Sequence, residues 1–455
     1  MMEEMREMME QMLLLLEEKR WSALRDMLAE LNPVDVAMLF EELSREQALP
    51  VFRLLPKTVA AETFSYMEPE TQEALIGVLS DKELGLVLDE LYMDDAADLI
   101  EEMPAGVVKR VLRVTDPADR RVINQLLRYP EDSAGSLLTT EFVDLRAGMT
   151  VEEALRHIRR TGPDKETIYT CYVTDNDRRL QGIISARELL LAHENQIIGD
   201  LMETNIISTA TTEDQETVAA LFAKYDLIVL PVVDSENRLV GIITVDDVVD
   251  IIQKETTEDI EKMAAVLPTD RSYFKTGVME TFSKRIPWLL LLMLSATVTG
   301  MIINSFESAL SSMVALVAFM PMLMGTGGNC GSQSSVTVIR SLALGDIEFR
   351  DTFRVIWKEL RVSLVCGVVL AVANFAKIFL LDNLLLGSHV TVAVAMVVSV
   401  TILVTVVISK LVGCTLPLIA KKIGFDPAVM ASPFITTIVD AVSLGVYFLI
   451  ATSFL

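Results

Sequence analysis

The residue with the clearest chemical meaning is Asp440, a carboxylate deep inside the last apolar stretch of this 455-residue chain. Placing a charge at the centre of a bilayer costs roughly 2.5–3.5 kcal/mol on insertion scales, so such residues usually face a bundle interior or a water-filled path. We therefore expect Asp440 to face a cation pathway. The simpler alternative is an ion pair with Lys410 or Lys377.

Hydroxyl side chains lie within about one helical turn of this carboxylate, at Thr436, Thr437 and Ser443. They could contact the waters around an ion, or they could only hydrogen-bond to the backbone of their own helix.

A second polar stretch interrupts the apolar sequence between Pro321 and Gln333, where four glycines occur in seven residues from Gly325 to Gly331. Glycine is a poor helix former. In a membrane it indicates tight helix packing or exposed backbone that lines a cavity. A phosphate-binding loop is excluded, because no Gly-Lys-Ser/Thr follows.

These parts suit Mg²⁺, which prefers octahedral oxygen ligands and keeps several of its waters. One aspartate per chain is few, so a homodimer would place two carboxylates across its axis and match a divalent charge. Zinc is a poor fit, because the chain has three His and no Cys/His cluster.

The elements that position these residues are five apolar runs, each able to cross about 30 Å of hydrocarbon as a helix. They cover roughly 286–306, 310–341, 360–382, 388–420 and 428–454. Lys and Arg are concentrated before the first run and in alternate loops. The positive-inside rule therefore puts the N-terminal half in the cytoplasm and the C-terminus outside a cell (inner) membrane.

The soluble part is strongly acidic. Of the 39 basic and 64 acidic residues, 28 and 56 lie before Lys284, which gives this part a net charge of −28. This charge argues against nucleic acid as a partner. The four cysteines have no CxxC spacing and fit small buried residues in a reducing compartment.

The soluble part shows two kinds of sequence pattern, one after the other. Residues 1–130 show helical periodicity, with a weak repeat at Asn32, Leu55 and Tyr92 that indicates stacked helical hairpins in a superhelix. Strand-rich segments then recur in tandem, with Gly182 and Gly241 at matching points.

The tandem resembles a pair of cystathionine-β-synthase (CBS) modules, which commonly bind adenine nucleotides in their cleft. Ser185, Arg187 and Glu188 are then candidates for ATP binding, and Thr244 and Asp247 form the matching turn in the second module. Simple helix N-caps are the alternative for both turns. Thr170 stands where an aromatic residue could stack on adenine.

The whole chain resembles the bacterial MgtE-type magnesium channels, part of the wider SLC41 family. The motifs that carry the resemblance are Gly325-Thr-Gly-Gly-Asn-x-Gly-x-Gln333, Ser432-Pro433 and the Asp440 helix. It implies a homodimer in a lipid bilayer whose pore binds hydrated Mg²⁺ at Asp440. The expected pore residues are Asp440, Thr436, Gly325, Gly328 and Asn329.

The resemblance also implies that Mg²⁺ bridges the soluble domains and holds the channel shut. The matching carboxylates are Glu62, Asp94 and Asp98 in the N domain, Asp214, Glu216, Asp226, Asp247 and Asp250 in the CBS pair, and Glu255, Glu258 and Asp259 in a connecting helix. Members of the family often have Asn where this chain has Ser332 and Ser432. Such differences would affect the hydration shell and hence the selectivity.

We therefore predict a multi-domain integral membrane protein that is not an enzyme. It has an all-α superhelical N domain (1–130), an α/β tandem CBS pair (131–200 and 201–256), a connecting helix (257–283) and a transmembrane domain of five helices (284–455). Its predicted function is Mg²⁺ uptake gated by cytosolic Mg²⁺.

The closest alternative is a broader transporter for Mn²⁺ or Co²⁺, or an ion-coupled carrier, because these ions accept the same oxygen ligands. A membrane metalloprotease lacks its motif, since no second His follows His193-Glu194 at the required spacing. A CBS-regulated anion channel would need more membrane helices and basic or amide pore groups.

Overall fold

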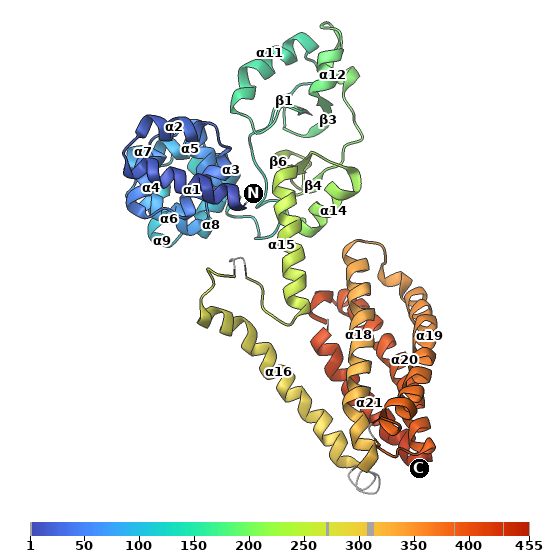
Figure 1. Ribbon diagram of the computed structural model, residues 1–455. Helices are drawn as coiled ribbons and strands as arrows, with labels where there is room; N and C mark the ends of the chain where they lie inside the picture. The colour runs from blue at the N-terminus through green and yellow to red at the C-terminus, as the bar shows by residue number, and fades with distance from the viewer. Residues whose placement is uncertain (1, 270–272, 307–313, 386, 431, 455) are drawn as a thin grey trace. The chain divides into compact units, whose positions relative to one another are not determined.

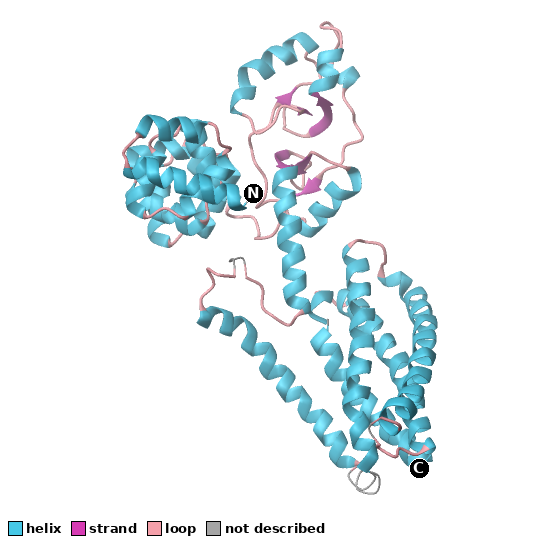
Figure 2. Cartoon of the chain, in the orientation of Figure 1, coloured by secondary structure: helices cyan, strands magenta, loops and turns pink. Residues whose placement is uncertain are grey.

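The computed structural model describes residues 2–269, 273–306, 314–385, 387–430 and 432–454, and the chain divides into two compact units, Met1–Ile251 and Ile252–Leu455 (Figure 1). The first unit holds short helices followed by two small sheets, and the second is helical (Figure 2).

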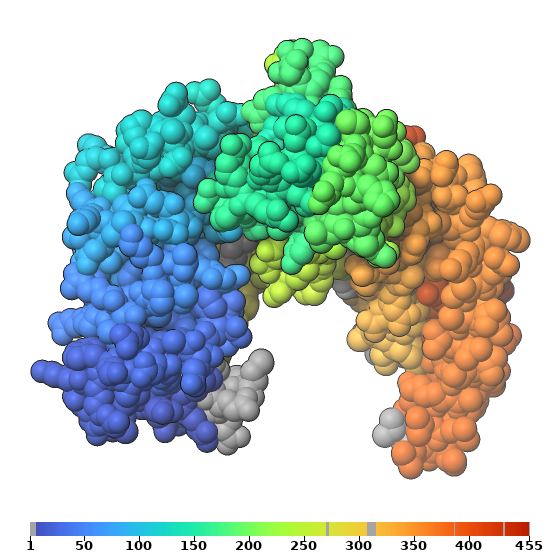
Figure 3. All heavy atoms as spheres, turned by 90° about the horizontal axis from the view of Figure 1, so that it is seen from above, coloured from blue at the N-terminus to red at the C-terminus, as the bar shows by residue number. Residues whose placement is uncertain are grey.

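The N-terminal domain is built from ten helices in its described residues, and all but the first have ten residues or fewer. They are α1 (Met2–Glu17), α2 (Trp21–Ala29), α3 (Pro33–Glu41), α4 (Arg45–Phe52), α5 (Lys57–Ser65), α6 (Pro69–Val78), α7 (Asp81–Leu88), α8 (Met93–Glu102), α9 (Ala105–Val114) and α10 (Asp119–Leu126). They form the blue-to-cyan surface in Figure 3.

A regular period underlies this domain. The seven helices from α3 to α9 begin every 12 residues, at positions 33, 45, 57, 69, 81, 93 and 105. Helices two apart pack together, as α3 does on α5 and α5 on α7. In the core, the rings of Phe40, Phe52 and Phe64 meet edge to face at centroid distances of 6.1 and 6.5 Å. The predicted helical superhelix is thus a one-helix repeat.

The two α/β modules repeat one topology, with a parallel strand pair followed by an antiparallel pair. The first contains β1 (Asp144–Leu145), α11 (Val151–Thr161), η1 (Gly162–Asp164), β2 (Thr170–Thr174), β3 (Leu180–Ser185), α12 (Ala186–Leu191) and α13 (Ile198–Leu201). The second contains β4 (Thr209–Ala210), α14 (Gln215–Tyr225), β5 (Val229–Val233), β6 (Leu239–Thr244) and the start of α15 (Val245–Met263).

The two glycines singled out in the sequence occupy equivalent ladder positions, with Gly182 opposite Val173 and Gly241 opposite Val232. A Cβ on Gly182 would lie 2.5 Å from the Met202 sulfur, and one on Gly241 would lie 2.4 Å from the carbonyl oxygen of Thr139. Both sites therefore need glycine because another chain segment approaches the sheet closely.

The N-terminal domain and the second module share a core. Ala97 of α8 and Leu126 of α10 cluster with Leu138, Phe222 and Val248 of the module. This contact brings one face of α8 toward the acidic start of α15.

The second unit consists of long helices: α16 (Val278–Ser305), α18 (Met320–Ala343), α19 (Thr352–Lys377), α20 (Val392–Lys422) and α21 (Ser432–Phe454). Short helical segments connect them: η2 (Val314–Phe319), η3 (Phe349–Asp351), η4 (Ile378–Asn383) and η5 (Pro427–Met430). The helix α18 packs on α20 and α21, α19 packs on α20, and α16 packs on α21.

Two features differ from the sequence expectation. In the described residues four helical segments, not five, are long and apolar enough to cross a membrane: Val278–Ser305, Phe349–Asn383, Val392–Lys422 and Pro427–Phe454. The helix expected from the second run is present as α18, but its glycine, serine and amide residues make it less apolar.

The predicted connecting helix at 257–283 is not continuous. The helix α15 ends at Met263, the left-handed conformation of Ala265 (φ 55°) closes it, and α16 begins only at Val278. A left-handed residue after the last turn is a common helix stop. Residues 270–272 of this segment lie outside the described residues.

Candidate functional site

The helix α21 presents Asp440 as a partly buried carboxylate. Among the described residues, neither a hydrogen bond nor an ion pair satisfies it. The two lysines considered as partners are engaged elsewhere: Lys410 lies 3.9 Å from Glu359, and Lys377 lies 3.0 Å from Asp382. The simpler alternative, an ion pair with either lysine, is therefore wrong for this structure.

The hydroxyls near Asp440 bond to their own helix. Thr436 and Thr437 donate to the carbonyl oxygen of Pro433 at 2.9 and 3.0 Å. This leaves the lone pairs of the Thr436 oxygen available to accept a hydrogen bond from a water, so the two roles are compatible.

Glycines let α18 approach its neighbours closely. A Cβ on Gly328 would lie 2.9 Å from Cγ2 of Thr436, and one on Gly327 would lie 2.9 Å from Oγ of Ser443. Where α18 crosses α20, a Cβ on Gly413 would lie only 2.2 Å from the carbonyl oxygen of Gly331. The glycine-rich segment is therefore a packing surface, one of the two readings of the sequence.

The remaining two pore candidates lie on a different face of α18. A Cβ on Gly325 would meet open space, and Asn329 is exposed. Asn329 lines an open cavity of about 800 Å³ together with Ser332, Gln333 and the pair formed by Glu359 and Lys410. Within one chain, Gly328 is thus packed against Thr436 of the Asp440 helix, whereas Asn329 faces this cavity.

The pair of Glu359 and Lys410 was not expected from the sequence. Their side chains are 12% and 7% exposed, and the Ser334 hydroxyl donates to Glu359 at 2.8 Å. Among the described residues of this unit, Glu359 is thus a second, largely buried acid besides the partly buried Asp440. In the sequence, Glu359 lies just before the third apolar run, at a position where a charged residue is expected to belong to a loop.

The end of α15 carries another unexpected contact. The Lys262 ammonium donates to Asp426 at 2.7 Å and also pairs with Glu258. Burial lowers the pKa of Lys262, but the bonds to these two carboxylates outweigh burial and raise it overall. Met263 packs nearby on Ile339 and Ala428.

Two predicted regulatory acids, Glu258 and Asp259, thus lie at this contact. Burial and then the charge of Asp426 raise the pKa of Asp259. Glu255 lies about one turn earlier on α15. Their neighbour Asp426 is more than 160 residues away in the chain and could not be predicted from the sequence.

In the first unit, carboxylates from three parts of the chain interact. We call this set the junction acids. They are Asp94, Asp95 and Asp98 on α8, Asp246 and Asp247 on α15, and Glu141 and Glu166 in the first module. Three of them, Asp94, Asp98 and Asp247, were predicted, and the structure brings them into one neighbourhood.

The electrostatics of the junction acids are unfavourable in the absence of cations. Burial, followed by the charges of Asp247 and its neighbours, raises the pKa of Asp95 to about 6. Burial and then Asp246 raise the pKa of Glu166 to about 8, and its Oε2 is buried without a hydrogen-bond partner among the described residues. The pKa of Asp247 also rises to about 6 because of burial, although Thr244 donates to it at 2.8 Å.

The pKa of Asp98 rises to about 7, first through burial and then through Asp95. The Asp98 side chain is exposed, so water screens its charge better than the charges of the partly buried Asp95 and Asp247. The predicted Glu62 is exposed on α5, where its charge acts on Tyr66 and Tyr92.

The other predicted acids of the CBS pair are not junction acids. Asp214 caps α14 by accepting the N–H of Glu216 at 2.9 Å, and Asp226 closes the same helix in a left-handed conformation (φ 52°). Asp250 is exposed on α15, where its charge contributes to the raised pKa of Asp247. Across the described residues, no three His, Cys, Asp or Glu side chains are arranged so that they could hold a metal ion directly.

The candidate nucleotide residues form a helix cap. Ser185 accepts the N–H of Glu188 at 3.1 Å, and its own N–H and hydroxyl donate to the Glu188 carboxylate at 2.8 Å. The N-cap alternative is thus confirmed for this turn. Arg187 is exposed on α12.

Comparison with known families covers most of the chain. The MgtE family model, described as a divalent cation transporter, matches residues 320–450. The model of the MgtE intracellular N domain matches 31–132, and the CBS domain model matches 134–195 and 198–254.

Full-length relatives are also found. The chain is 41% identical to Magnesium transporter MgtE of Thermus thermophilus over 440 residues, which is 96% of each chain. It is 33% identical to Magnesium transporter MgtE of Bacillus subtilis over 453 residues, 99% of this chain and 98% of the relative.

Two solved structures resemble about half of the chain. One is the cytosolic domain of the Mg²⁺ channel MgtE in complex with ATP, with 44% identity and a TM-score of 0.50, covering 52% of this chain and 96% of that one. The other is the soluble part of a magnesium transporter, with 28% identity and a TM-score of 0.52, covering 55% and 99%.

Proposed function

Because the chain belongs to the MgtE family of divalent cation transporters, we propose that it carries Mg²⁺ across a membrane and closes when cytosolic Mg²⁺ is abundant. The observation that carries this proposal is the full-length similarity to magnesium transporters, together with an Asp440 carboxylate that the described residues leave without a partner. A transporter family is not an enzyme class.

For conduction, Asp440 acts as the cation ligand. An intramembrane carboxylate with no counter-charge is unstable alone, so a hydrated cation that presents water hydrogens to it would stabilise the site. Mg²⁺ gives up its bound waters reluctantly and usually keeps several of them, so it suits contacts made through water. A homodimer would supply a second Asp440, and the two carboxylates would balance the charge of one divalent ion.

For closure, the junction acids act as the sensor. Packed carboxylates repel one another, and burial adds to the cost of their charge. Mg²⁺ binding removes this penalty in the packed form, so it shifts the population toward that form. The predicted acids Glu62, Asp214, Glu216 and Asp226 lie outside the junction acids and would need a second chain or a rearrangement to take part, whereas the charge of Asp250 already acts on Asp247.

The helix α15 carries residues of the proposed sensor and residues that contact the membrane unit. It carries Asp247 near its start, and near its end it carries Glu258, Asp259 and Lys262. The Lys262 contact with Asp426 touches the segment between α20 and α21, directly before the Asp440 helix. A change at α15 would therefore act on the helix that holds the proposed ion ligand.

ATP is a proposed regulator at the CBS pair, supported by the similar cytosolic domain that was solved with ATP. Ser185, Arg187 and Glu188 are the candidate contacts. With the basic loops facing the cytoplasm, the soluble unit lies on the cytoplasmic side of the cell membrane and the C-terminus lies on the outer side.

The test is ion flux into liposomes containing the full-length chain, with Mg²⁺, Mn²⁺, Co²⁺ and Ca²⁺ compared. We expect Asp440→Ala to abolish Mg²⁺ flux, whereas Asp346→Ala, which removes an exposed acid in the loop before α19, should retain it. Mg²⁺ flux in Asp440→Ala at matched protein levels would refute the pore assignment. Equal flux of Mn²⁺ and Co²⁺ would favour the broader carrier that the family description also allows.

A further inference from the structure

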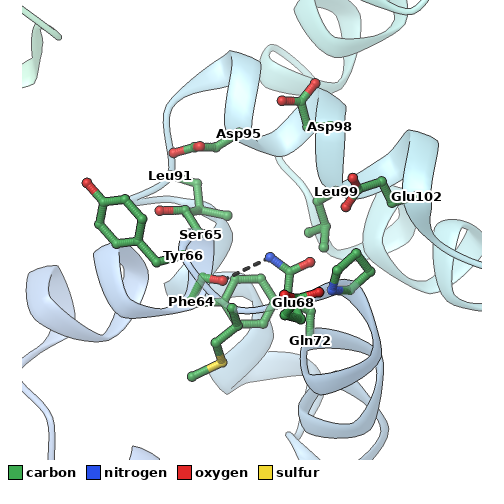
Figure 4. Close-up of a pocket in the computed structure, with 12 residues that line it drawn as sticks. Phe64, Ser65, Tyr66, Glu68, Gln72, Leu91, Asp95, Asp98, Leu99 and Glu102 are labelled. Carbon is green, nitrogen blue, oxygen red and sulfur yellow. Dashed lines mark hydrogen bonds between the residues drawn. The ribbon is translucent and has the colours of Figure 1, made fainter. Parts of the chain in front are cut away.

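A cavity of about 300 Å³ lies within the N-terminal domain, between the end of α5, the start of α6 and one face of α8 (Figure 4). Its polar groups are Ser65, Gln72, Asp95, Asp98, Glu68 and Glu102. Lys, Arg and His are absent from the described residues that line it. The end of α5 adds the negative end of a helix dipole.

Gln72 marks this cavity as a built site. The residue is only 6% exposed, and its Nε2 donates to the carbonyl oxygen of Phe64 at 2.9 Å (Figure 4). Because a carbonyl can only accept, this bond fixes which end of the amide is oxygen. That oxygen, Oε1, is buried and has no hydrogen-bond partner among the described residues. A buried amide oxygen normally has a donor, so the missing partner is a group that donates.

The charge of the cavity points to the same kind of partner. Asp95 and Asp98 are three residues apart on α8, and both residues line the cavity (Figure 4). The described residues provide neither with an ion pair or a side-chain hydrogen bond. A ligand that satisfies the amide oxygen and both carboxylates must be a cation with several N–H or O–H donors.

The walls distinguish an organic cation from a metal ion. Phe64, Leu91 and Leu99 also line the cavity, and they present apolar surface beside the oxygens. In the described residues, the acids are not arranged to coordinate a metal directly. Ammonium groups on a methylene chain fit both features, because N–H groups donate to the oxygens and methylenes pack on apolar walls.

We propose that this cavity binds an organic polycation of the polyamine class, with one ammonium held by Gln72 Oε1 and another beside the Asp95 and Asp98 carboxylates. Because these two aspartates are also junction acids, the bound polyamine competes with Mg²⁺ for the same negative charge.

The test is calorimetric titration of the full-length chain with spermidine, in Mg²⁺-free buffer with about 0.15 M salt to screen non-specific attraction. We expect saturable binding of one spermidine per chain. Gln72→Leu and Asp95→Asn should each weaken it at least tenfold. The control Glu73→Gln removes an exposed acid from the same helix as Gln72 and should bind like the wild type.

A second variant separates loss of the site from loss of folding. Gln72→Glu keeps the size of the side chain and an oxygen for the ammonium, although it loses the hydrogen bond from Nε2 to the Phe64 carbonyl. It should therefore retain saturable spermidine binding where Gln72→Leu loses it. Equal affinity in all four variants, or loss of binding by a folded Gln72→Glu, would overturn the proposal. The proposal would also be overturned if hexaamminecobalt(III), a rigid mimic of hydrated Mg²⁺, bound at Gln72 and Asp95 and spermidine did not.

Discussion

Replacing Lys410, the buried lysine of the membrane unit, tests whether its ion pair with Glu359 stabilises this unit. In Lys410→Met the Glu359 carboxylate remains, 12% exposed, without its counter-charge. Breaking a buried ion pair costs about 3–5 kcal/mol, since the remaining charge is uncompensated. The separation of 3.9 Å is long, and the Ser334 hydroxyl still donates to Glu359, so we expect about 3 kcal/mol.

For a unit of this size, 1 kcal/mol corresponds to roughly 2–4 °C in the unfolding midpoint. Lys410→Met should therefore lower the midpoint by about 6–12 °C, measured by calorimetry in detergent. The double variant Lys410→Met with Glu359→Gln removes both charges and should recover most of this loss.

A matched control is available in the same unit. Arg350 also pairs with an acid, Glu348 at 3.1 Å, but the two side chains are 78% and 60% exposed. Exposed pairs contribute about 0–1 kcal/mol, so Arg350→Met should shift the midpoint by less than about 4 °C. If Lys410→Met proves no more destabilising than Arg350→Met, the buried-pair reasoning is wrong.

Three further outcomes can be checked with the same preparations. Gly413→Val places side-chain atoms against the Gly331 carbonyl and should destabilise the membrane unit by at least about 1–3 kcal/mol, whereas Gly300→Ala, which meets open space, should not; calorimetry compares them. Burial raises the pKa of several junction acids to between about 6 and 8, so the metal-free packed form binds extra protons and gains stability as the pH falls. Because protons and Mg²⁺ both favour the packed form, protease protection should need less Mg²⁺ at pH 6 than at pH 8. Lys262→Met breaks the bond to Asp426 and should weaken the inhibition of flux by cytosolic Mg²⁺; unchanged inhibition would separate this contact from gating.

The sequence was most informative where a pattern is local. The equivalence of Gly182 and Gly241 is confirmed by their ladder positions, because each strand and turn is encoded within a few residues. The glycine-rich segment was recognised as a packing surface or a lining, and packing against Thr436 resolves part of that choice.

Contacts between distant segments could not be predicted. Glu166 and Glu141 join Asp95 only because two domains share a core, and nothing in their local sequence distinguishes them from surface acids. Asp426 lies in the short segment between α20 and α21, and nothing in its local sequence indicates that it is the partner of Lys262. Regulatory roles for Asp214, Asp226 and the other acids outside the junction remain predictions from family resemblance.

The even spacing of helix starts from α3 to α9 has a consequence for how this domain can change in length. When helices touch mainly the helices two further along, stability is close to a sum of nearest-neighbour interfaces. Deleting or duplicating 24 residues, two helices, preserves the alternation of the stack and rejoins like faces, whereas removing 12 would bring unlike faces together. We therefore expect that the domain can be lengthened or shortened in units of two helices without loss of the contacts between the remaining helices.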